Sequence, residues 1–240
     1  MHDLLTRHTP LVPVEILEAR YEDALKRLLS DDSADTFGSY LEFGVYRGDS
    51  MLCMQRASER VGLGGMRLFG FDSFEGMPDS SGPEDAATRS GGGLSYRPGA
   101  LKSPYDETVK AMTQQGADWE RIKLVPGWYD QTLTPEARDQ TDIRRASVIM
   151  IDCVLYSSTL AALRFCEPLI QDAAIVFLDD WDAGAEVVSE GAAGERRAFE
   201  EFIAAHPGLR AEPIGSYAHA EDDPPSLAMI MLVRRIDRSA

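Results

Sequence analysis

Apolar residues recur at helical spacing near the start of the chain. The segment PVEILEARYEDALKRLL carries an apolar side chain at every third or fourth position, namely at Val14, Leu17, Tyr21, Leu25 and Leu28. This spacing predicts an amphipathic helix, and the polar run DDSAD over residues 31–35 predicts its end. We therefore expect a helical extension over residues 1–38, ahead of a domain over residues 39–240.

From residue 39 onward, short apolar runs alternate with helical patterns. The runs are SYLEFGV, RLFGFD, RIKLVPG, SVIMID, AIVFLDD, LRAEPIG and SLAMIMLVRR, and the expected helices cover about 50–60, 104–115, 157–170 and 195–205. Helix-length crossovers separate the first five runs, so these strands should be parallel, whereas a short connection over 216–225 favours an antiparallel final pair. The pattern predicts an α/β fold of about seven strands.

One segment breaks this alternation. Residues 78–103, PDSSGPEDAATRSGGGLSYRPGALKS, are rich in Gly, Ser and Pro and show no apolar period. A loop of this length inside a compact domain is typical of a mobile lid that covers a binding site. The alternative is a solvated insert that has no function. No repeat or interdomain linker is evident, so we expect a single globular unit.

Charge and cysteine content narrow the possible partners. Lys and Arg number 24 against 40 Asp and Glu, which gives a formal net charge of −16. Such a surface repels nucleic-acid phosphates and anionic membranes, so neither is expected as a partner. Three cysteines without CxxC spacing argue against a disulfide framework and a zinc site. With no secretory leader pattern at the start, a cytoplasmic protein is expected.

Candidate ligand-binding residues follow the first two strands, because α/β sheets bind ligands beyond the carboxyl ends of their strands. Gly44 and Gly48 allow a tight turn there, with Glu42 just before them. Their GxxxG spacing is typical of the nucleotide loop of S-adenosylmethionine (SAM) methyltransferases, although a purely structural corner needs glycine as well. Asp72 is suited to accept ribose hydroxyls, and its alternative role is to cap a helix beginning near Ser73.

Three further carboxylates follow the fourth and fifth strands. Asp152, Asp179 and Asp180 should converge at one edge of the sheet, where they raise one another's pKa unless a cation lies among them. A hard divalent ion such as magnesium prefers these oxygen ligands, whereas a single Asp could simply cap a helix. The histidines, at positions 2, 8, 206 and 219, lie away from this edge, so a histidine base is not expected. Neither GxSxG nor a P-loop occurs, which excludes the corresponding hydrolases and kinases.

Five motifs in order along the chain, YLEFGVYRGDSM, FGFDSFEGMP, VPGWYDQTL, MIDCVLYSSTLAAL and FLDDW, carry a specific resemblance. Over residues 40–202 the sequence resembles the macrocin O-methyltransferase (TylF/MycF) family of SAM-dependent methyltransferases. The resemblance implies a class I Rossmann-like fold, with a mostly parallel seven-stranded sheet, an antiparallel last strand and helices on both faces. It also implies methyl transfer to a hydroxyl of a sugar or small-molecule intermediate in antibiotic or other natural-product biosynthesis.

The resemblance assigns roles to individual residues. The cofactor-binding residues it implies are Glu42, Gly44, Tyr46, Gly48, Ser50, Asp72, Ser73, Gly127, Trp128 and Asp152. Trp128 or Tyr129 would lie near the adenine, with core packing as the alternative role. The resemblance further implies a homo-oligomer and a magnesium ion held by Asp152, Asp179 and Asp180, with Asp152 or Asp179 as the catalytic base.

The sequence departs from the family at Val154, where the family carries a metal-binding Asp. A valine cannot ligate a metal, so the site loses one oxygen ligand and one negative charge. Magnesium could bind through the remaining acids with more water. Alternatively, the enzyme could methylate nitrogen or carbon without a metal, or the protein could bind SAM without methylating. The acceptor itself, expected in a pocket formed by residues 78–103 and 182–194, is left open.

Overall fold

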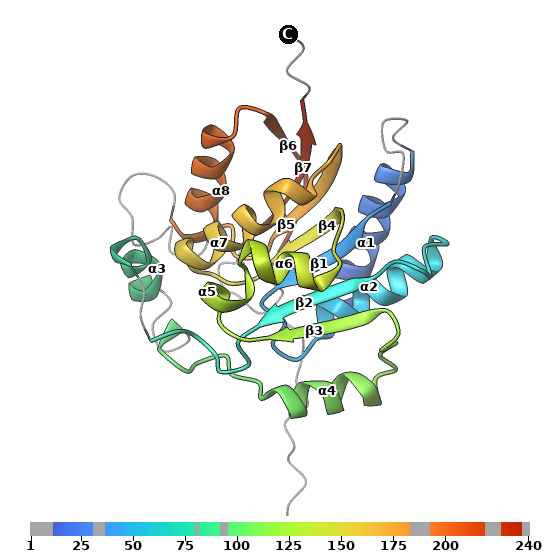
Figure 1. Ribbon diagram of the computed structural model, residues 1–240, viewed down its shortest axis with the longest axis horizontal. Helices are drawn as coiled ribbons and strands as arrows, with labels where there is room; N and C mark the ends of the chain where they lie inside the picture. The colour runs from blue at the N-terminus through green and yellow to red at the C-terminus, as the bar shows by residue number, and fades with distance from the viewer. Residues whose placement is uncertain are drawn as a thin grey trace, which may run out of the picture.

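The computed structural model describes residues 12–30, 37–79, 82–91, 96–182, 193–218 and 227–236. In chain order its elements are α1 (Val14–Leu29), β1 (Ser39–Phe43), α2 (Asp49–Arg60), β2 (Leu68–Asp72), a 3-10 turn (Pro83–Asp85), α3 (Ala86–Gly91), α4 (Tyr105–Gln114), β3 (Ile122–Pro126), α5 (Tyr129–Thr132), α6 (Pro135–Thr141), β4 (Ala146–Ile151), α7 (Tyr156–Cys166), a 3-10 turn (Glu167–Leu169), β5 (Ala173–Leu178), α8 (Gly194–Ala205), β6 (Leu209–Ala218) and β7 (Leu227–Arg235) (Figure 1). Every expected strand and long helix is confirmed. The sequence pattern missed α3, α5 and α6, which are too short to show an apolar period.

The strands form one sheet in the order β3-β2-β1-β4-β5-β7-β6. Strands β1 to β5 pair in parallel, and β7 runs antiparallel to both of its neighbours, as the sequence predicted. Strands β4 and β5 are buried at every position, because helices cover both faces and both strands can be continuously apolar. The strand order reverses between β1 and β4, and a crevice for a ligand forms at such a point.

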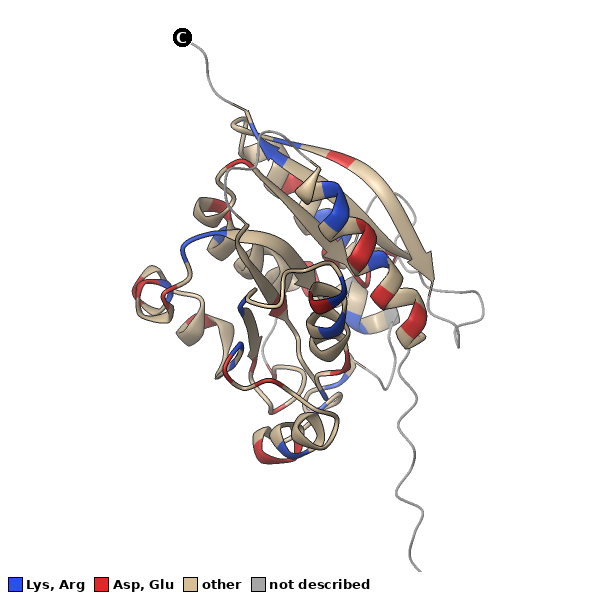
Figure 2. Cartoon of the chain, turned by 90° about the vertical axis from the view of Figure 1, so that its right-hand side faces the viewer, with Lys and Arg blue, Asp and Glu red and all other residues tan. Residues whose placement is uncertain are grey.

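Two helical layers cover the sheet, one on each face (Figure 1). Alternate strand residues such as Tyr40, Val148 and Phe177 pack with α1, α2 and α4, whereas their neighbours in the sequence pack with α7 and α8. Positions with acidic and basic residues alternate along several of these helices (Figure 2). Between α1 and α2, the guanidinium of Arg60 lies 2.7 Å from the Glu22 carboxylate. The described part of the chain contains no helix with the length and apolarity needed to cross a bilayer.

The segment expected to be a lid contains regular structure. Asp85 is fully buried, and its carboxylate accepts hydrogen bonds from the Ser157 backbone N–H at 3.0 Å and the Ser157 hydroxyl at 2.6 Å. The Arg89 guanidinium donates to the carbonyls of Pro78 (2.8 Å) and Tyr96 (2.9 Å). The expectation of an irregular segment was therefore wrong for residues 83–91, where contacts with distant parts of the chain stabilise the helix. Residues 80–81 and 92–95 lie outside the described part of the chain, and opening of the lid stays a prediction.

Candidate active site

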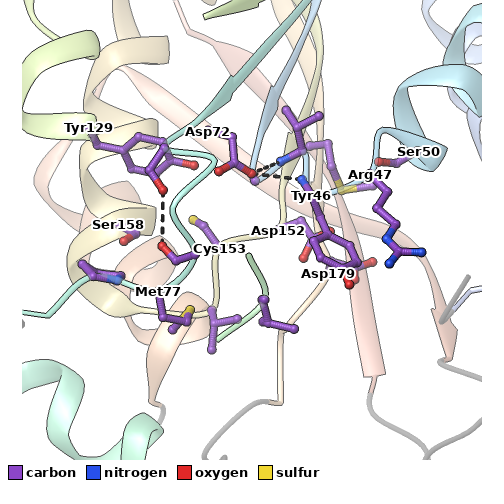
Figure 3. A pocket seen from close by; sticks show the side chains of 18 of the residues that line it. Tyr46, Arg47, Ser50, Asp72, Met77, Tyr129, Asp152, Cys153, Ser158 and Asp179 are labelled. Carbon is purple, nitrogen blue, oxygen red and sulfur yellow. Dashed lines mark hydrogen bonds between the residues drawn. The ribbon is translucent and has the colours of Figure 1, made fainter. Parts of the chain in front are cut away.

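A cavity of about 760 Å³ opens at the carboxyl ends of β1, β2, β4 and β5 (Figure 3). The sequence-predicted residues that line it are Gly44, Tyr46, Ser50, Asp72, Ser73, Trp128, Tyr129, Asp152 and Asp179. The cavity lining does not include Glu42, Gly48, Gly127 or Asp180. Val14 and Leu17 of α1 also line the cavity, a contribution that the sequence analysis did not anticipate. The expected convergence of strand-end residues is thus present, with an apolar wall added by the N-terminal helix.

The loop after β1 is held by the carboxylate at the end of β2. One Asp72 oxygen accepts the backbone N–H groups of Val45 (2.8 Å) and Tyr46 (2.9 Å), shown as dashed lines in Figure 3, and the other accepts the Phe74 N–H (2.7 Å). No helix begins at Ser73, so the capping role considered for Asp72 is wrong. The carboxylate fixes the loop that faces the cavity, and its contact with a ribose stays a prediction.

Gly44 allows two strand ends to approach closely. Its φ is +93°, and a Cβ there would lie 1.8 Å from the carbonyl oxygen of Asp152. The Gly44 N–H donates to the Phe71 carbonyl, and the Asp152 N–H donates to the Phe43 carbonyl. Any larger residue would separate β1 from β4. The glycine is therefore a steric requirement of the strand order as well as part of the cavity wall.

Glu42 lies beneath the cavity wall in a chain of hydroxyl groups. It is fully buried and accepts hydrogen bonds from the hydroxyls of Tyr40 (2.5 Å) and Ser50 (2.7 Å). The Tyr40 hydroxyl also lies 3.0 Å from that of Tyr21 in α1. Burial raises the pKa of Glu42 to about 8. Since Ser50 lines the cavity and Glu42 does not, Glu42 acts on the cavity through the serine.

The acidic rim gathers four carboxyl groups that influence one another. Burial and then the charges of Asp179, Asp180 and Glu195 raise the pKa of Asp152 well above its usual value. The Tyr217 hydroxyl donates to Asp179 at 2.5 Å. Glu195, in the first turn of α8, was missed by the sequence analysis because an acid there is common at any helix N-terminus. Only the tertiary fold brings it to the ends of β4 and β5.

The rim does not present a ligand set for magnesium. Val154 is buried against Met77 and Leu155, and it offers no oxygen from its side chain. Both Glu195 oxygens accept backbone N–H groups, from Cys153 and Val154 on one side and Asp180 on the other. Across the described ranges, no three His, Cys, Asp or Glu side chains are arranged to hold a metal ion. The residues that are present therefore do not fit the ion that the family resemblance implies.

The sheet order, the glycine loop and the cavity at the strand ends define the class I SAM-dependent methyltransferase fold. The family model for macrocin-O-methyltransferase (TylF) matches residues 14–205, and the chain belongs to that family. This match confirms the resemblance found in the sequence motifs and extends it through α1.

Known proteins similar to the chain include antibiotic-pathway enzymes. The chain is 30% identical over 179 residues to the 8-demethyl-8-(2,3-dimethoxy-alpha-L-rhamnosyl)-tetracenomycin-C 4'-O-methyltransferase of Streptomyces olivaceus, covering 74% of this chain and 66% of that protein. The structure of the O-methyltransferase NovP superposes with a TM-score of 0.68 at 21% identity, covering 93% of this chain and 79% of NovP. An O-methyltransferase from Bacillus cereus in complex with SAH gives 0.55 at 16% identity, covering 97% and 94%.

Gly44→Ala is expected to destabilise the protein far more than Gly62→Ala. Both glycines have positive φ, which costs alanine about 1 kcal/mol, but only Gly44 faces a backbone oxygen at its Cβ position, whereas Gly62 faces open space. Urea unfolding should show a loss of about 1 kcal/mol for Gly62→Ala and roughly 3 kcal/mol or more for Gly44→Ala. Equal losses would show that the β1 and β4 ends can separate at little cost.

Glu42→Gln is expected to reduce the loss of stability at alkaline pH. Because the folded-state pKa of Glu42 is about 8 against an ordinary 4.5, the folded form retains a proton that the unfolded form releases, so stability falls as pH rises between these values. The variant removes this fall. Relative to wild type it should gain roughly 3 kcal/mol in unfolding free energy between pH 5 and pH 8.5.

Urea titrations across this pH range measure the gain, with the exposed Glu107→Gln on α4 as the matched control. The control should follow the wild-type curve. A Glu42→Gln curve parallel to wild type at every pH would show that Glu42 is ionised in the folded protein without cost.

Proposed function

We propose that the protein transfers the methyl group of SAM to a hydroxyl of a sugar or of a glycosylated natural product. The observation that carries this proposal is the single cavity lined by both the β1 loop with Asp72 and the acidic residues Asp152 and Asp179. The family match and the rhamnosyl acceptor named for the Streptomyces olivaceus relative support a sugar hydroxyl. Because the chain spans 66% of that relative's length, the acceptor is a proposal for this chain.

SAM would occupy the part of the cavity bounded by the β1 loop and Asp72. One Asp72 oxygen accepts two backbone N–H groups and the other accepts one, so the second oxygen keeps a lone pair suited to a ribose hydroxyl. Tyr129 packs edge-on against Phe43, with ring centroids 6.2 Å apart, so part of its role lies in the core. Trp128, at the start of α5, and Tyr129 both line the cavity, and the core contact of Tyr129 favours Trp128 as the adenine contact.

Methyl transfer requires a proton acceptor as well as positioning. The acceptor oxygen bonds to the methyl carbon while the carbon–sulfur bond breaks, and the hydroxyl proton must leave the oxygen. Asp152 lines the cavity, and its raised pKa makes its carboxylate a better proton acceptor near neutral pH. Asp179 already accepts a hydrogen bond from Tyr217, so Asp152 is the favoured base and Asp179 the supporting charge.

Magnesium, when bound, would supply a Lewis acid that lowers the pKa of the acceptor hydroxyl. The donor set described above does not fit it, so the mechanism proposed here assigns the proton to Asp152 directly. An amine or carbon acceptor is the alternative that the same donor set permits. A cytoplasmic location agrees with the three free cysteines at positions 53, 153 and 166, and a homo-oligomer is proposed from the family resemblance alone.

Asp72→Ala is expected to weaken the binding of S-adenosylhomocysteine (SAH) at least tenfold. The substitution removes the acceptor of two loop N–H groups and of the proposed ribose contact, each worth about 1 kcal/mol or more. Calorimetric titration measures the affinity, and the exposed Asp139→Ala in α6 should bind SAH as wild type does. A folded wild-type protein that does not bind SAH would reject the whole proposal.

Asp152→Asn is expected to lower kcat by roughly 100-fold to 10,000-fold, as the loss of a general base does. SAH affinity should change less than threefold, since the amide keeps the size of the carboxyl. Rates are measured as SAH release with a panel of rhamnosylated and free-sugar acceptors, and the methylated atom is located by NMR. Methylation of nitrogen or carbon, or an unchanged kcat, would contradict the proposed roles.

A further inference from the structure

Glu195 joins the backbone at two strand ends with a single carboxyl group. One of its oxygens accepts the N–H groups of Cys153 (3.2 Å) and Val154 (3.3 Å), which follow β4. The other accepts the N–H of Asp180 (3.0 Å), which follows β5. The residue is fully buried, and its contacts are with backbone groups next to the residues proposed for chemistry.

Burying a carboxyl group destabilises the folded protein unless hydrogen-bond donors surround the group. Burial raises the pKa of Glu195 well above its usual value, and the hydrogen bonds from the peptide N–H groups oppose this rise. These donors follow β4 and β5, and the pairing of the two strands ends with the hydrogen bond from the Asp179 N–H to the Ile151 carbonyl, so Glu195 joins the two loops just beyond the last bond of the sheet. The same contacts that stabilise the carboxylate therefore fix the distance between the two loops.

Val154 depends on this arrangement more than its neighbours do. Its φ is +61°, a left-handed conformation that is strained for a β-branched residue. The Glu195 carboxylate accepts its N–H from one side, and its side chain packs with Met77, Leu155 and Tyr96 on the other. Val154, which stands where the family resemblance implies a metal-binding Asp, thus forms a buried apolar contact with the segment over residues 78–103.

We propose that Glu195 is a positioning residue that joins the β4 and β5 ends through peptide N–H groups, and that methyl transfer here needs no divalent ion. The inference rests on the proposed function. A metal site joins such strand ends by placing a cation among side-chain carboxylates. Here a buried carboxyl group lies among backbone donors instead, and Asp152 and Asp179 line the cavity from the loops that it joins.

The first test uses the wild-type protein, so it does not depend on the folding of a variant. After exhaustive chelation, methyl transfer should retain at least half of its rate, and added Mg²⁺ should change that rate less than twofold. Calorimetric titration of Mg²⁺ into the SAH-bound protein should show no saturable binding below millimolar concentration. Activity that is lost on chelation and restored by Mg²⁺, or tight Mg²⁺ binding, would overturn the proposal.

The second test compares Glu195→Gln with Glu200→Gln on the same helix. Glu200 is exposed and pairs with Arg196, so its substitution controls for a lost charge on α8. Glu195→Gln places an amide NH₂ where a carboxylate oxygen accepted an N–H, which should lower kcat at least tenfold with KM for SAM within threefold. Amide hydrogen exchange at residues 153, 154 and 180 should accelerate at least tenfold in this variant alone. Equal behaviour of the two variants would overturn the positioning role.

The outcomes separate this inference from the proposed function. If the wild-type protein binds SAH and methylates no acceptor, the proposed function fails, while hydrogen exchange and Mg²⁺ titration still decide the role of Glu195. If the wild-type protein methylates an acceptor, but Glu195→Gln and the control Glu200→Gln both lose this activity and both raise KM for SAM, the positioning role is rejected. Glu195 then serves only to maintain the fold. Glu195→Asp then gives a further comparison, since its shorter side chain cannot reach both loops and should not restore kcat.

Discussion

The close approach of the β1 and β4 ends at Gly44 is the constraint on which the rest of the site depends. The two strands exchange backbone hydrogen bonds just where their order in the sheet reverses, and no side chain fits between them. The loop after β1 therefore turns away from β4 directly after Gly44. The Asp72 carboxylate fixes this turn by accepting the N–H groups of Val45 and Tyr46. The cavity forms where the loops that follow β1 and β4 leave the sheet in different directions.

Sequence patterns predicted the features that depend on local chemistry. Continuous apolar runs predicted β4 and β5. The positions of acids just after strands predicted that Asp152, Asp179 and Asp180 would converge, and the first two of these line the cavity. Glu195 and Asp85 could not be predicted, because each is an ordinary acid in a polar segment until the tertiary fold buries it against distant backbone. Glu42 is fully buried and is not among the residues that line the cavity, so its predicted contact with the cofactor stays a prediction.

The buried acids of this protein are stabilised by several kinds of neutral donor. Glu42 accepts hydroxyl hydrogen bonds, Asp179 a phenol, and Glu195 peptide N–H groups. Burial nevertheless raises the pKa of Glu42, Asp152 and Glu195, so these acids keep their protons to a higher pH than exposed acids do.

A chain of hydrogen-bonding groups runs from Tyr21 of α1 through Tyr40 and Glu42 to Ser50, so the first helix helps to support the cavity wall. Val14 and Leu17 of the same helix also form cavity wall. The helix before the first strand thus lines part of the cavity and also stabilises the residues behind the cavity wall, although most of the site is formed by later residues. Any exchange of α1 for another helix should therefore include the β1 loop, because Tyr21 of α1 contacts the hydroxyl that donates to Glu42.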